Sequence, residues 1–206
     1  MTTRSARRRE ILDEETILDA TATILRRHGP AKATVLDVAR ELGVSHGSVY
    51  RFFPSKAALR EEVTRRWLTA GHGVLAGIAA RTDLPPPARL ESWLGTLFGT
   101  TRGQVADDPE LFATFLVLVR EQSGVVDAHV AELRRQIAGI LADGAADGSL
   151  APGPDLTGTA AAVLNAVTRF HHPAHAAAWE RDSAEADFAS LRALVLDALR
   201  PARSDG

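Results

Sequence analysis

Residues that can contact a nucleic acid gather between positions 43 and 56 of the chain. The stretch reads GVSHGSVYRFFPSK and places small and hydrogen-bonding side chains ahead of a tyrosine and a lysine. The small or hydrogen-bonding residues are Ser45, His46, Gly47 and Ser48. At the start of a helix they would let the backbone approach base edges, while free N–H groups there can bind phosphate. Because Tyr50 offers a hydroxyl and Lys56 a positive charge to phosphate oxygens, the stretch predicts contact with duplex DNA.

Two short helices are expected around this stretch, joined by Leu42-Gly43-Val44. Gly43 suits the tight turn because glycine accepts a positive φ without steric cost. Thr34 is the expected N-cap of the first helix and Ser45 that of the second. The residues expected to pack together behind the second helix are Val49, Phe53, Ile17, Val38 and Leu42. Residues 34–53 therefore predict a helix-turn-helix whose second helix lies in the major groove.

A second group of chemistry-bearing side chains is the histidine cluster RFHHPAH, residues 169–175. Pro173 prevents the i, i+4 helical geometry that His171 and His175 would need to share a metal ion, and no carboxylate follows until Glu180. We expect no metal site here. The cluster is expected to end a helix, and a place along a ligand cavity stays open.

Catalytic chemistry is not expected from this sequence. It has no cysteine, no glycine-rich phosphate loop and no nucleophile-elbow pattern. The chain is therefore predicted not to be an enzyme and to need no cofactor.

Composition and charge narrow the class of protein further. The 206 residues are 45% hydrophobic with a net charge of −2. Residues 1–70 hold 13 Lys and Arg against 9 Asp and Glu, whereas residues 71–206 hold 11 against 17. This asymmetry indicates a basic head on a mildly acidic body. Because no apolar run approaches the roughly 18 residues that span a membrane and no signal segment follows the first arginines, we expect a soluble cytoplasmic protein.

Helical periodicity dominates the chain, and strand signals are nearly absent. Glycine and proline divide it into about nine expected helices, at residues 15–28, 35–42, 45–53, 56–80, 87–104, 109–122, 126–143, 155–171 and 183–199. We predict an all-α fold in which a long helix joins a three-helix N-terminal head to an α-helical body. The expected DNA-binding domain spans residues 1–62, and the expected ligand-binding and dimerisation domain spans residues 63–206.

Residues 15–60 resemble the DNA-binding domain of the TetR-type (tetracycline-repressor-like) regulators. The matching positions are Ile17-Leu18-Asp19-Ala20, Gly29, Thr34-Val35, Val38-Ala39, Gly43-Val44-Ser45, Gly47-Ser48-Val49-Tyr50, Phe53, Lys56 and Leu59. The sequence departs from the family pattern at Leu25, Pro30, His46 and Phe52. At position 46 a lysine or arginine is usual, so these departures are expected to change operator choice more than DNA binding itself.

The resemblance implies an all-α homodimer that binds a pseudo-palindromic DNA operator, most simply as a repressor that a small apolar effector releases. By position, the phosphate contacts would be Thr34, Tyr50 and Lys56, and the residues at the bases would be Ser45, His46 and Ser48, with Gly47 beside them. A different class stays open, namely an all-helical small-molecule binding or scaffolding protein whose helical hairpin meets a protein partner. The salt dependence of duplex binding separates the two.

The body is expected to contain a ligand cavity and a dimer interface. The cavity is implied by the resemblance, and its expected lining is Trp93, Leu97, Phe98, Thr101, Phe112, Phe115, Leu116, Val119, Gln122 and Asn165. Apolar stripes on the last two helices, widened by Ala161, Ala162, Ala166, Ala189 and Ala193, predict an isologous four-helix interface between two subunits. Its expected residues are Val163, Leu164, Val167, Leu191, Leu194 and Val195.

Four arginines precede the head, at Arg4, Arg7, Arg8 and Arg9 within residues 1–10. Two interpretations stay open. The segment is either a solvated tail or a basic arm that follows phosphates or enters the minor groove.

Overall fold

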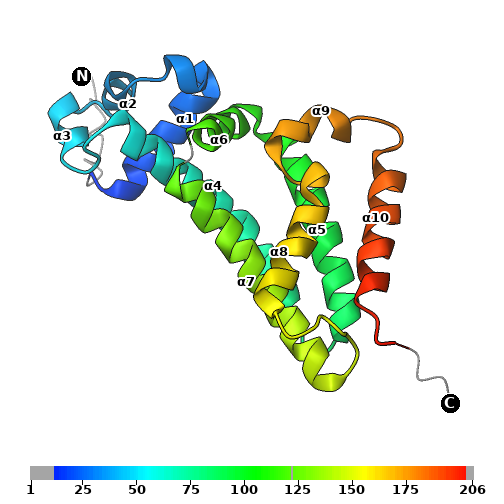
Figure 1. Ribbon diagram of the computed structural model, residues 1–206. Coiled ribbons are helices and arrows are strands. Elements are labelled where there is room, and N and C mark those ends of the chain that lie inside the picture. The colour runs from blue at the N-terminus through cyan, green and yellow to red at the C-terminus, as the bar shows by residue number, and fades with distance from the viewer. Residues whose placement is uncertain (1–11, 122, 203–206) are drawn as a thin grey trace, which may run out of the picture.

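The computed structural model of the protein describes residues 12–121 and 123–202, and this part of the chain folds into ten α-helices (Figure 1). They are α1 (Glu14–Lys32), α2 (Val35–Leu42), α3 (His46–Tyr50), α4 (Lys56–Ala79), α5 (Pro86–Asp107), α6 (Pro109–Arg120), α7 (Gly124–Asp147), α8 (Leu156–Ala166), α9 (Ala176–Trp179) and α10 (Ala184–Ala198). Helices α1 to α3 and the first turns of α4 form the head, at one end of the molecule (Figure 1). The rest of α4 and the later helices form the body.

Local capping sets the helix boundaries of the head. Thr34 and Asp37 form a reciprocal capping box at the start of α2, as the sequence predicts. Gly43 ends α2 in the left-handed conformation with φ 65°, and the Ser45 side chain caps α3. These short-range interactions hold α2 and α3 in the predicted helix-turn-helix.

Helix α4 belongs to both hydrophobic cores of the molecule. Leu59 and Val63 are buried in the head core, whereas Leu68 and Leu75 are buried in the body core. Trp67 packs partly against both. The change from one core to the other therefore lies between Val63 and Leu68, inside one continuous helix.

Helix α6 makes a second connection between body and head. Its Leu111 is buried in the head core. At the start of the helix, Asp108 accepts a hydrogen bond from Arg26 of α1, with an Nη2–Oδ2 distance of 2.7 Å. A displacement of α6 would therefore move α1 through these contacts.

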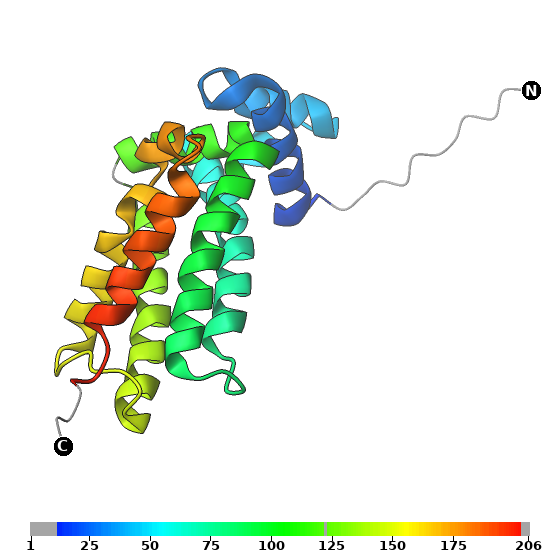
Figure 2. The ribbon, with the colours of Figure 1, turned by 90° about the vertical axis from the view of Figure 1, so that its right-hand side faces the viewer.

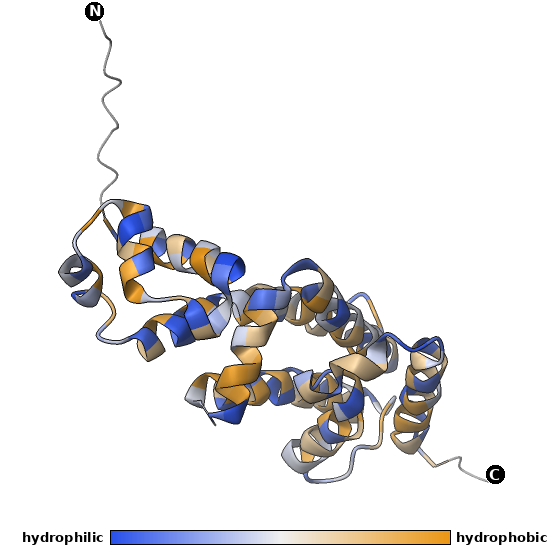
Figure 3. Ribbon diagram, turned by 90° about the horizontal axis from the view of Figure 1, so that it is seen from above, coloured by the Kyte–Doolittle hydropathy of each residue, from blue (hydrophilic) through white to orange (hydrophobic). Residues whose placement is uncertain are grey.

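The body is a bundle in which α4, α5, α7, α8 and α10 run side by side (Figure 2). The apolar positions of these helices turn toward one another and the polar ones outward (Figure 3). Trp93 lies fully buried at its centre, where its indole Nε1 donates to Gln136 Oε1 at 2.9 Å. None of the described helices combines the length and the hydropathy needed to cross a membrane.

Several helix boundaries differ from the prediction, among them the ends of α1, α3, α7 and α8. The first helix breaks at Gly29, with φ 71°, but one more turn continues to Lys32. Helix α8 ends at Ala166, where the sequence predicts residue 171, and two 3₁₀ turns and the short α9 follow it. The β-branched pair Val167 and Thr168 favours this early end, and Pro173 lacks the N–H that would continue a helical ladder.

Candidate DNA-binding helix and ligand pocket

Helix α3 is anchored by one face and leaves the other free. Val49 is fully buried and Phe53 is 7% exposed, both in the head core. On the opposite side the polar residues predicted to meet DNA are exposed or half-buried: Ser45, His46, Gly47, Ser48 and Tyr50. The structure therefore places these predicted residues on one solvent-facing surface.

Internal contacts hold this polar surface in one arrangement. Ser45 Oγ lies 2.8 Å from Ser48 Oγ and accepts a hydrogen bond from the Ser48 N–H. The His46 and Tyr50 rings meet edge to face, with their centroids 4.8 Å apart. Because these contacts already fix the side chains, little side-chain entropy would be lost when the surface binds DNA.

Thr34 and Lys56, the other two predicted phosphate contacts, already have partners. Thr34 Oγ1 donates to Asp37 Oδ2 at 2.6 Å, and this hydrogen bond lowers the pKa of the Asp37 carboxyl. Lys56 Nζ lies 3.4 Å from the Ala31 carbonyl oxygen. A bond this long is weak, so the ammonium group is available for a phosphate.

Next to the predicted DNA contacts lies Arg51, a cation that the sequence prediction did not name. Arg51 follows Tyr50 directly and is exposed at the end of α3. Its only sequence signal is this position after the recognition residues. The predicted arm residues, Arg4, Arg7, Arg8 and Arg9, lie outside the described residues.

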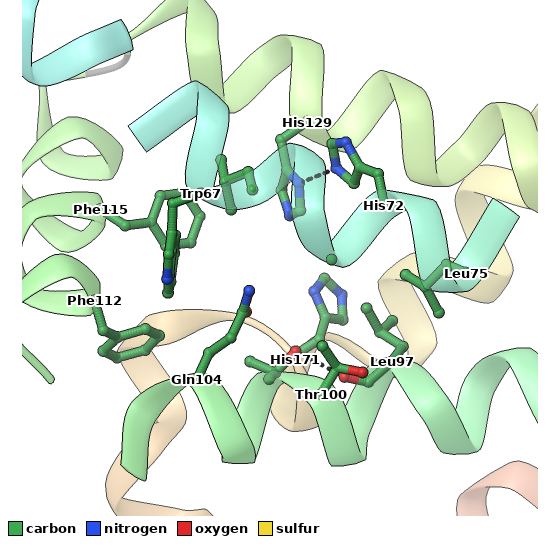
Figure 4. A pocket seen from close by; sticks show the side chains of 13 residues that line it. Trp67, His72, Leu75, Leu97, Thr100, Gln104, Phe112, Phe115, His129 and His171 are labelled. Atoms are coloured by element: carbon green, nitrogen blue, oxygen red, sulfur yellow. Dashed lines mark hydrogen bonds between the residues drawn. The ribbon is translucent and has the colours of Figure 1, made fainter. Parts of the chain in front are cut away.

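A pocket opens in the body between α4, α5, α6, α7 and the segment that follows α8 (Figure 4). Aromatic rings line one side of it: Trp67, Phe112 and Phe115. His72, Thr100, His129 and His171 lie on the other side, together with Leu75 and Leu97, and Thr101 and Gln104 also line the pocket. The pocket region encloses about 450 Å³ when its open mouth and the gaps between side chains are counted. The cavity proper is only about 30 Å³, enough for one or two water molecules.

Three histidines from three segments meet at the polar side. His72 Nε2 of α4 lies 2.6 Å from His129 Nδ1 of α7, and the two rings stack. The third, His171, comes from the segment after α8, and its Nε2 donates to the Leu164 carbonyl oxygen at 3.3 Å.

Burial keeps these rings neutral. The pKa of His129 is lowered to about 3 and that of His171 to about 4, chiefly by loss of solvation and to a lesser extent by the charges of neighbouring histidines. Burial also lowers the pKa of His72, against an opposing effect of Glu132.

The family of the chain follows from its two halves. The family model described as "Bacterial regulatory proteins, tetR family" matches residues 17–63, and the one described as "Tetracyclin repressor-like, C-terminal domain" matches residues 86–192. The chain belongs to the TetR family. Members of the TetR family are DNA-binding transcription factors and not enzymes.

Relatives of known sequence agree with this assignment. An uncharacterized HTH-type transcriptional regulator of Mycobacterium tuberculosis (strain ATCC 25618 / H37Rv) is 34% identical over 112 residues, which are 54% of this chain and 52% of the relative. The counterpart from strain CDC 1551 matches equally. The chain thus spans about half the length of the curated relatives that it matches.

Solved structures share the TetR-family fold over nearly the whole chain. A TetR transcription regulator from Haloarcula marismortui superposes with a TM-score of 0.70 at 19% identity, covering 91% of this chain and 97% of the other. SmeT, the repressor of the Stenotrophomonas maltophilia multidrug efflux pump SmeDEF, gives 0.69 at 18% identity, covering 95% and 94%. FadR from Bacillus subtilis, solved in complex with stearoyl-CoA, gives 0.62 at 17% identity, covering 91% and 98%. At these identities the likeness concerns the fold alone.

Four of the ten residues predicted to line the effector cavity of this TetR-family chain do line the pocket: Leu97, Thr101, Phe112 and Phe115. Trp93 lies one turn before Leu97, where its ring fills the space against α7, and Phe98 packs edge to face on Phe170 and at a tilt on Phe188 in the core. Leu116 and Val119 also pack against the body core.

The two polar residues predicted for the cavity do not appear in it. Asn165 is exposed on α8, so its predicted place in the cavity is wrong, because α8 turns Val163 and Leu164 inward and Asn165 outward. Gln122 lies outside the described residues.

Two polar residues of the pocket, His72 and His129, were not predicted from the sequence. Each takes a place that an apolar residue would fill in a helical stripe, after Leu68 on α4 and between Val125 and Leu133 on α7. A histidine in such a stripe was the available signal. Within residues 12–121 and 123–202, no group of three or more His, Cys, Asp or Glu side chains is arranged to hold a metal ion.

The predicted interface residues divide between core and surface. Val163, Leu164, Val167 and Val195 are buried inside the single chain, and Leu191 is half-buried. Within the single chain these residues pack in the body core. Leu194 is 66% exposed. Beside it the exposed faces of α8 and α10 carry small residues: Ala162, Ala166, Ala189 and Ala193.

Proposed function

We propose that this TetR-family chain is a ligand-responsive repressor that acts in the cytoplasm. It binds a pseudo-palindromic operator as a homodimer, and a small, largely apolar effector releases it. The observation that carries the proposal is the free face of α3, on which Ser45, His46, Ser48 and Tyr50 lie together while Val49 anchors the helix from behind. A helix held in this way presents base-reading groups at its N-terminal end and a phosphate-binding hydroxyl beside them.

The exposed faces of α8 and α10 support the dimer. Ala162, Ala166, Ala189 and Ala193 allow close approach of two helices, and Leu194 supplies an apolar anchor. A two-fold axis through these faces would form a four-helix interface. The two copies of α3 would then reach successive major grooves about 34–36 Å apart.

The path from pocket to head supports the switch. Trp67, Gly71 and His72 of α4 line the pocket, while the first turns of the same helix are buried in the head core. At about 1.5 Å per residue, the 24 residues of α4 measure about 36 Å from end to end, and Trp67 at the pocket lies only one turn after Val63 in the head core. Helix α6 makes a parallel connection, because Phe112 and Phe115 line the pocket and Leu111 enters the head core.

The small size of the cavity makes ligand binding and motion inseparable. A molecule larger than one or two waters must push the pocket walls apart, and two of those walls are α4 and α6. A hundredfold loss of operator affinity requires about 2.7 kcal/mol of differential ligand binding. Burying on the order of 100 Å² more apolar ligand surface in the widened form could supply it.

The test begins with selection of a binding site from random duplexes by the full-length protein. We expect a pseudo-palindrome, bound as a dimer, with an affinity that falls steeply with salt concentration. His46→Ala and Ser48→Ala should change the preferred bases, whereas Arg120→Ala, an exposed cation on α6, should leave them unchanged. Failure to enrich any sequence, together with salt-independent capture of a protein partner, would favour the scaffolding alternative.

A further inference from the structure

We propose that the effector is an amphipathic weak acid, an aryl or alkyl carboxylate that binds together with one proton taken from solvent. This inference rests on the proposed function and names the chemical class of its ligand. Figure 4 shows the geometry behind it: the rings of His129 and His171 lie on one side of the space, opposite Trp67 and Phe112, and the amide of Gln104 lies between the two sides. One side of the pocket thus suits a polar head group and the other an apolar body.

The charge of the lining selects the sign of the ligand. None of the described residues that line the pocket is acidic, so an ammonium ligand would be buried without a counter-charge. The same lining holds three imidazoles, which become cations by accepting a proton. An anion can therefore be neutralised inside the pocket, whereas a cation cannot.

The charged and titratable side chains near the three histidines come from α7 and from the segment after α8. Glu132 of α7 faces His72, and hydrogen bonds from Arg135 and Gln136 keep the pKa of Glu132 at about 2. The positive charges of His172 and His175, when present, oppose protonation of His171. Helices α5 and α6 contribute no titratable side chain to the pocket, only Leu97, two threonines, Gln104 and two phenylalanines.

The hydrogen bonds of the three histidines show which ring nitrogens can accept a proton. His171 Nε2 must donate to the Leu164 carbonyl, which only accepts, so the Nδ1 of the neutral ring carries a lone pair. Between His72 and His129 one N–H is shared, which leaves the pair with one further donor and one further acceptor nitrogen. Each acceptor nitrogen can take a proton without breaking the hydrogen bond already made.

The first proton makes the second costly. Two imidazolium rings in one small pocket would repel each other, and for this reason the charges of His72 and His171 lower the pKa of His129. A bound carboxylate next to one ring raises the pKa of that ring, because the opposite charge favours the protonated form. One carboxylate should therefore bring in one proton, and the filled pocket is neutral overall.

Matched probes test the proposal on the full-length protein. The probes are 3-phenylpropionate, its neutral analogue 3-phenylpropanamide and its cationic analogue 3-phenylpropylamine, with octanoate as an alkyl acid. Binding is followed by tryptophan fluorescence, because Trp67 lines the pocket. We expect at least one of the two acids to bind at least tenfold more tightly than both the amide and the amine at pH 6.5.

Proton uptake gives the second measurement. A free carboxylate has a pKa of about 4–5 and is ionised between pH 6 and pH 8. The affinity of the acid should therefore fall at least tenfold from pH 6 to pH 8. Calorimetry in two buffers of different ionisation enthalpy should show an uptake close to one proton per ligand at pH 6.5.

Substitutions of single histidines test which ring takes up the proton when the acid binds. In His171→Gln the amide can still donate to the Leu164 carbonyl but cannot be protonated, and His129→Gln removes the base from the other side. At least one of them should lower both the affinity for the acid and the proton uptake, while His28→Gln, at an exposed site on α1, should change neither. Should both variants fail to fold, the wild-type comparison of acid, amide and amine decides alone.

The outcomes separate this inference from the proposed function. Acids that do not bind at millimolar concentration, an amine or amide that binds as tightly as the acid, or an affinity independent of pH would each overturn the weak-acid proposal. If the amide or the amine then releases the selected operator, the repressor function stands without it. If the acid binds with a proton but no duplex is ever bound, the ligand class stands and the repressor function fails.

Discussion

The head and the body of this chain bring their functional atoms together over very different distances along the sequence. The proposed DNA contacts lie between Thr34 and Lys56, on two short helices and the turns beside them. The pocket in the body takes residues from Trp67 to His171, on four helices and a later segment. Neighbours in the chain thus build the DNA-binding surface, whereas helix packing builds the pocket.

This difference has a physical consequence for stability. In the head, Thr34, Asp37, Gly43 and Ser45 set the helix ends through local hydrogen bonds and backbone conformation. In the body, the pocket exists only while α4, α5, α6 and α7 keep their distances. The surface of the head should therefore tolerate changes that close or distort the pocket.

The largest expected effect comes from separating the proposed dimer. Ala162→Glu with Leu194→Glu places charges on the exposed faces of α8 and α10 and should give monomers in sedimentation. Operator affinity should fall more than about a hundredfold, because one half-site alone supplies half of the contacts. Val74→Glu, at another exposed apolar residue, is the control and should stay dimeric. A double variant that remains a dimer would place the interface elsewhere.

The second largest effect is expected from a fall in pH, which should destabilise the body before the head. His129 and His171 have pKa values of about 3 and about 4 in the folded protein, below the ordinary value of 6.5. Their contribution to stability is therefore complete above about pH 6.5 and is lost as the pH falls toward 4. In the head, the pKa of Asp37 is lowered from its ordinary value of 3.8. The contribution of Asp37 to stability is therefore lost at a lower pH than that of the histidines, below about 3.8.

Hydrogen exchange measured by mass spectrometry between pH 7 and pH 4.5 tests this order. Once corrected for the intrinsic pH dependence of exchange, peptides from residues 68–79 of α4 and from α5 and α7 should lose protection before those from α2 and α3. His129→Gln should reduce the pH dependence, while His28→Gln, on an exposed site, should leave it unchanged. Simultaneous loss in both regions would show that head and body unfold as one unit.

Two glycines on the same helix test packing in the body. A Cβ at Gly144 would lie 2.6 to 2.8 Å from three atoms of the Leu150 side chain, whereas one at Gly139 would meet nothing within 4 Å. Gly144→Ala should cost about 1–3 kcal/mol in urea unfolding. Gly139→Ala should stabilise the protein by up to about 1 kcal/mol. Equal stability of the two variants would contradict the described contact between α7 and Leu150.

The smallest effect is expected from a single phosphate contact in the head. Lys56→Ala should lower operator affinity for all sequences alike and reduce the slope of log affinity against log salt by about one unit. Its weak bond to the Ala31 carbonyl predicts almost no change in thermal stability. Arg120→Ala on α6 is the matched cation control. An unchanged slope for Lys56→Ala would mean that the head docks in another orientation.

Sequence patterns predicted the head well because its signals are local. The capping box of Thr34 and Asp37, the turn at Gly43 and the burial of Val49 all follow from residues at most four positions apart. In the body the same reasoning placed Leu97, Thr101, Phe112 and Phe115 at the pocket. It failed for Asn165, since periodicity shows which residues share a helix face but not which neighbour that face meets.

By itself the sequence determined the all-α class, the helix-turn-helix and the anchored α3, because caps, turns and apolar periodicity act within a few residues. Only the tertiary structure decided that Val163, Leu164 and Val195 belong to the core of one chain. It also decided that His72, His129 and His171 meet, although they are up to 99 positions apart. Such a meeting depends on how α4, α7 and the segment after α8 pack, and packing is set by the fit of whole helix faces.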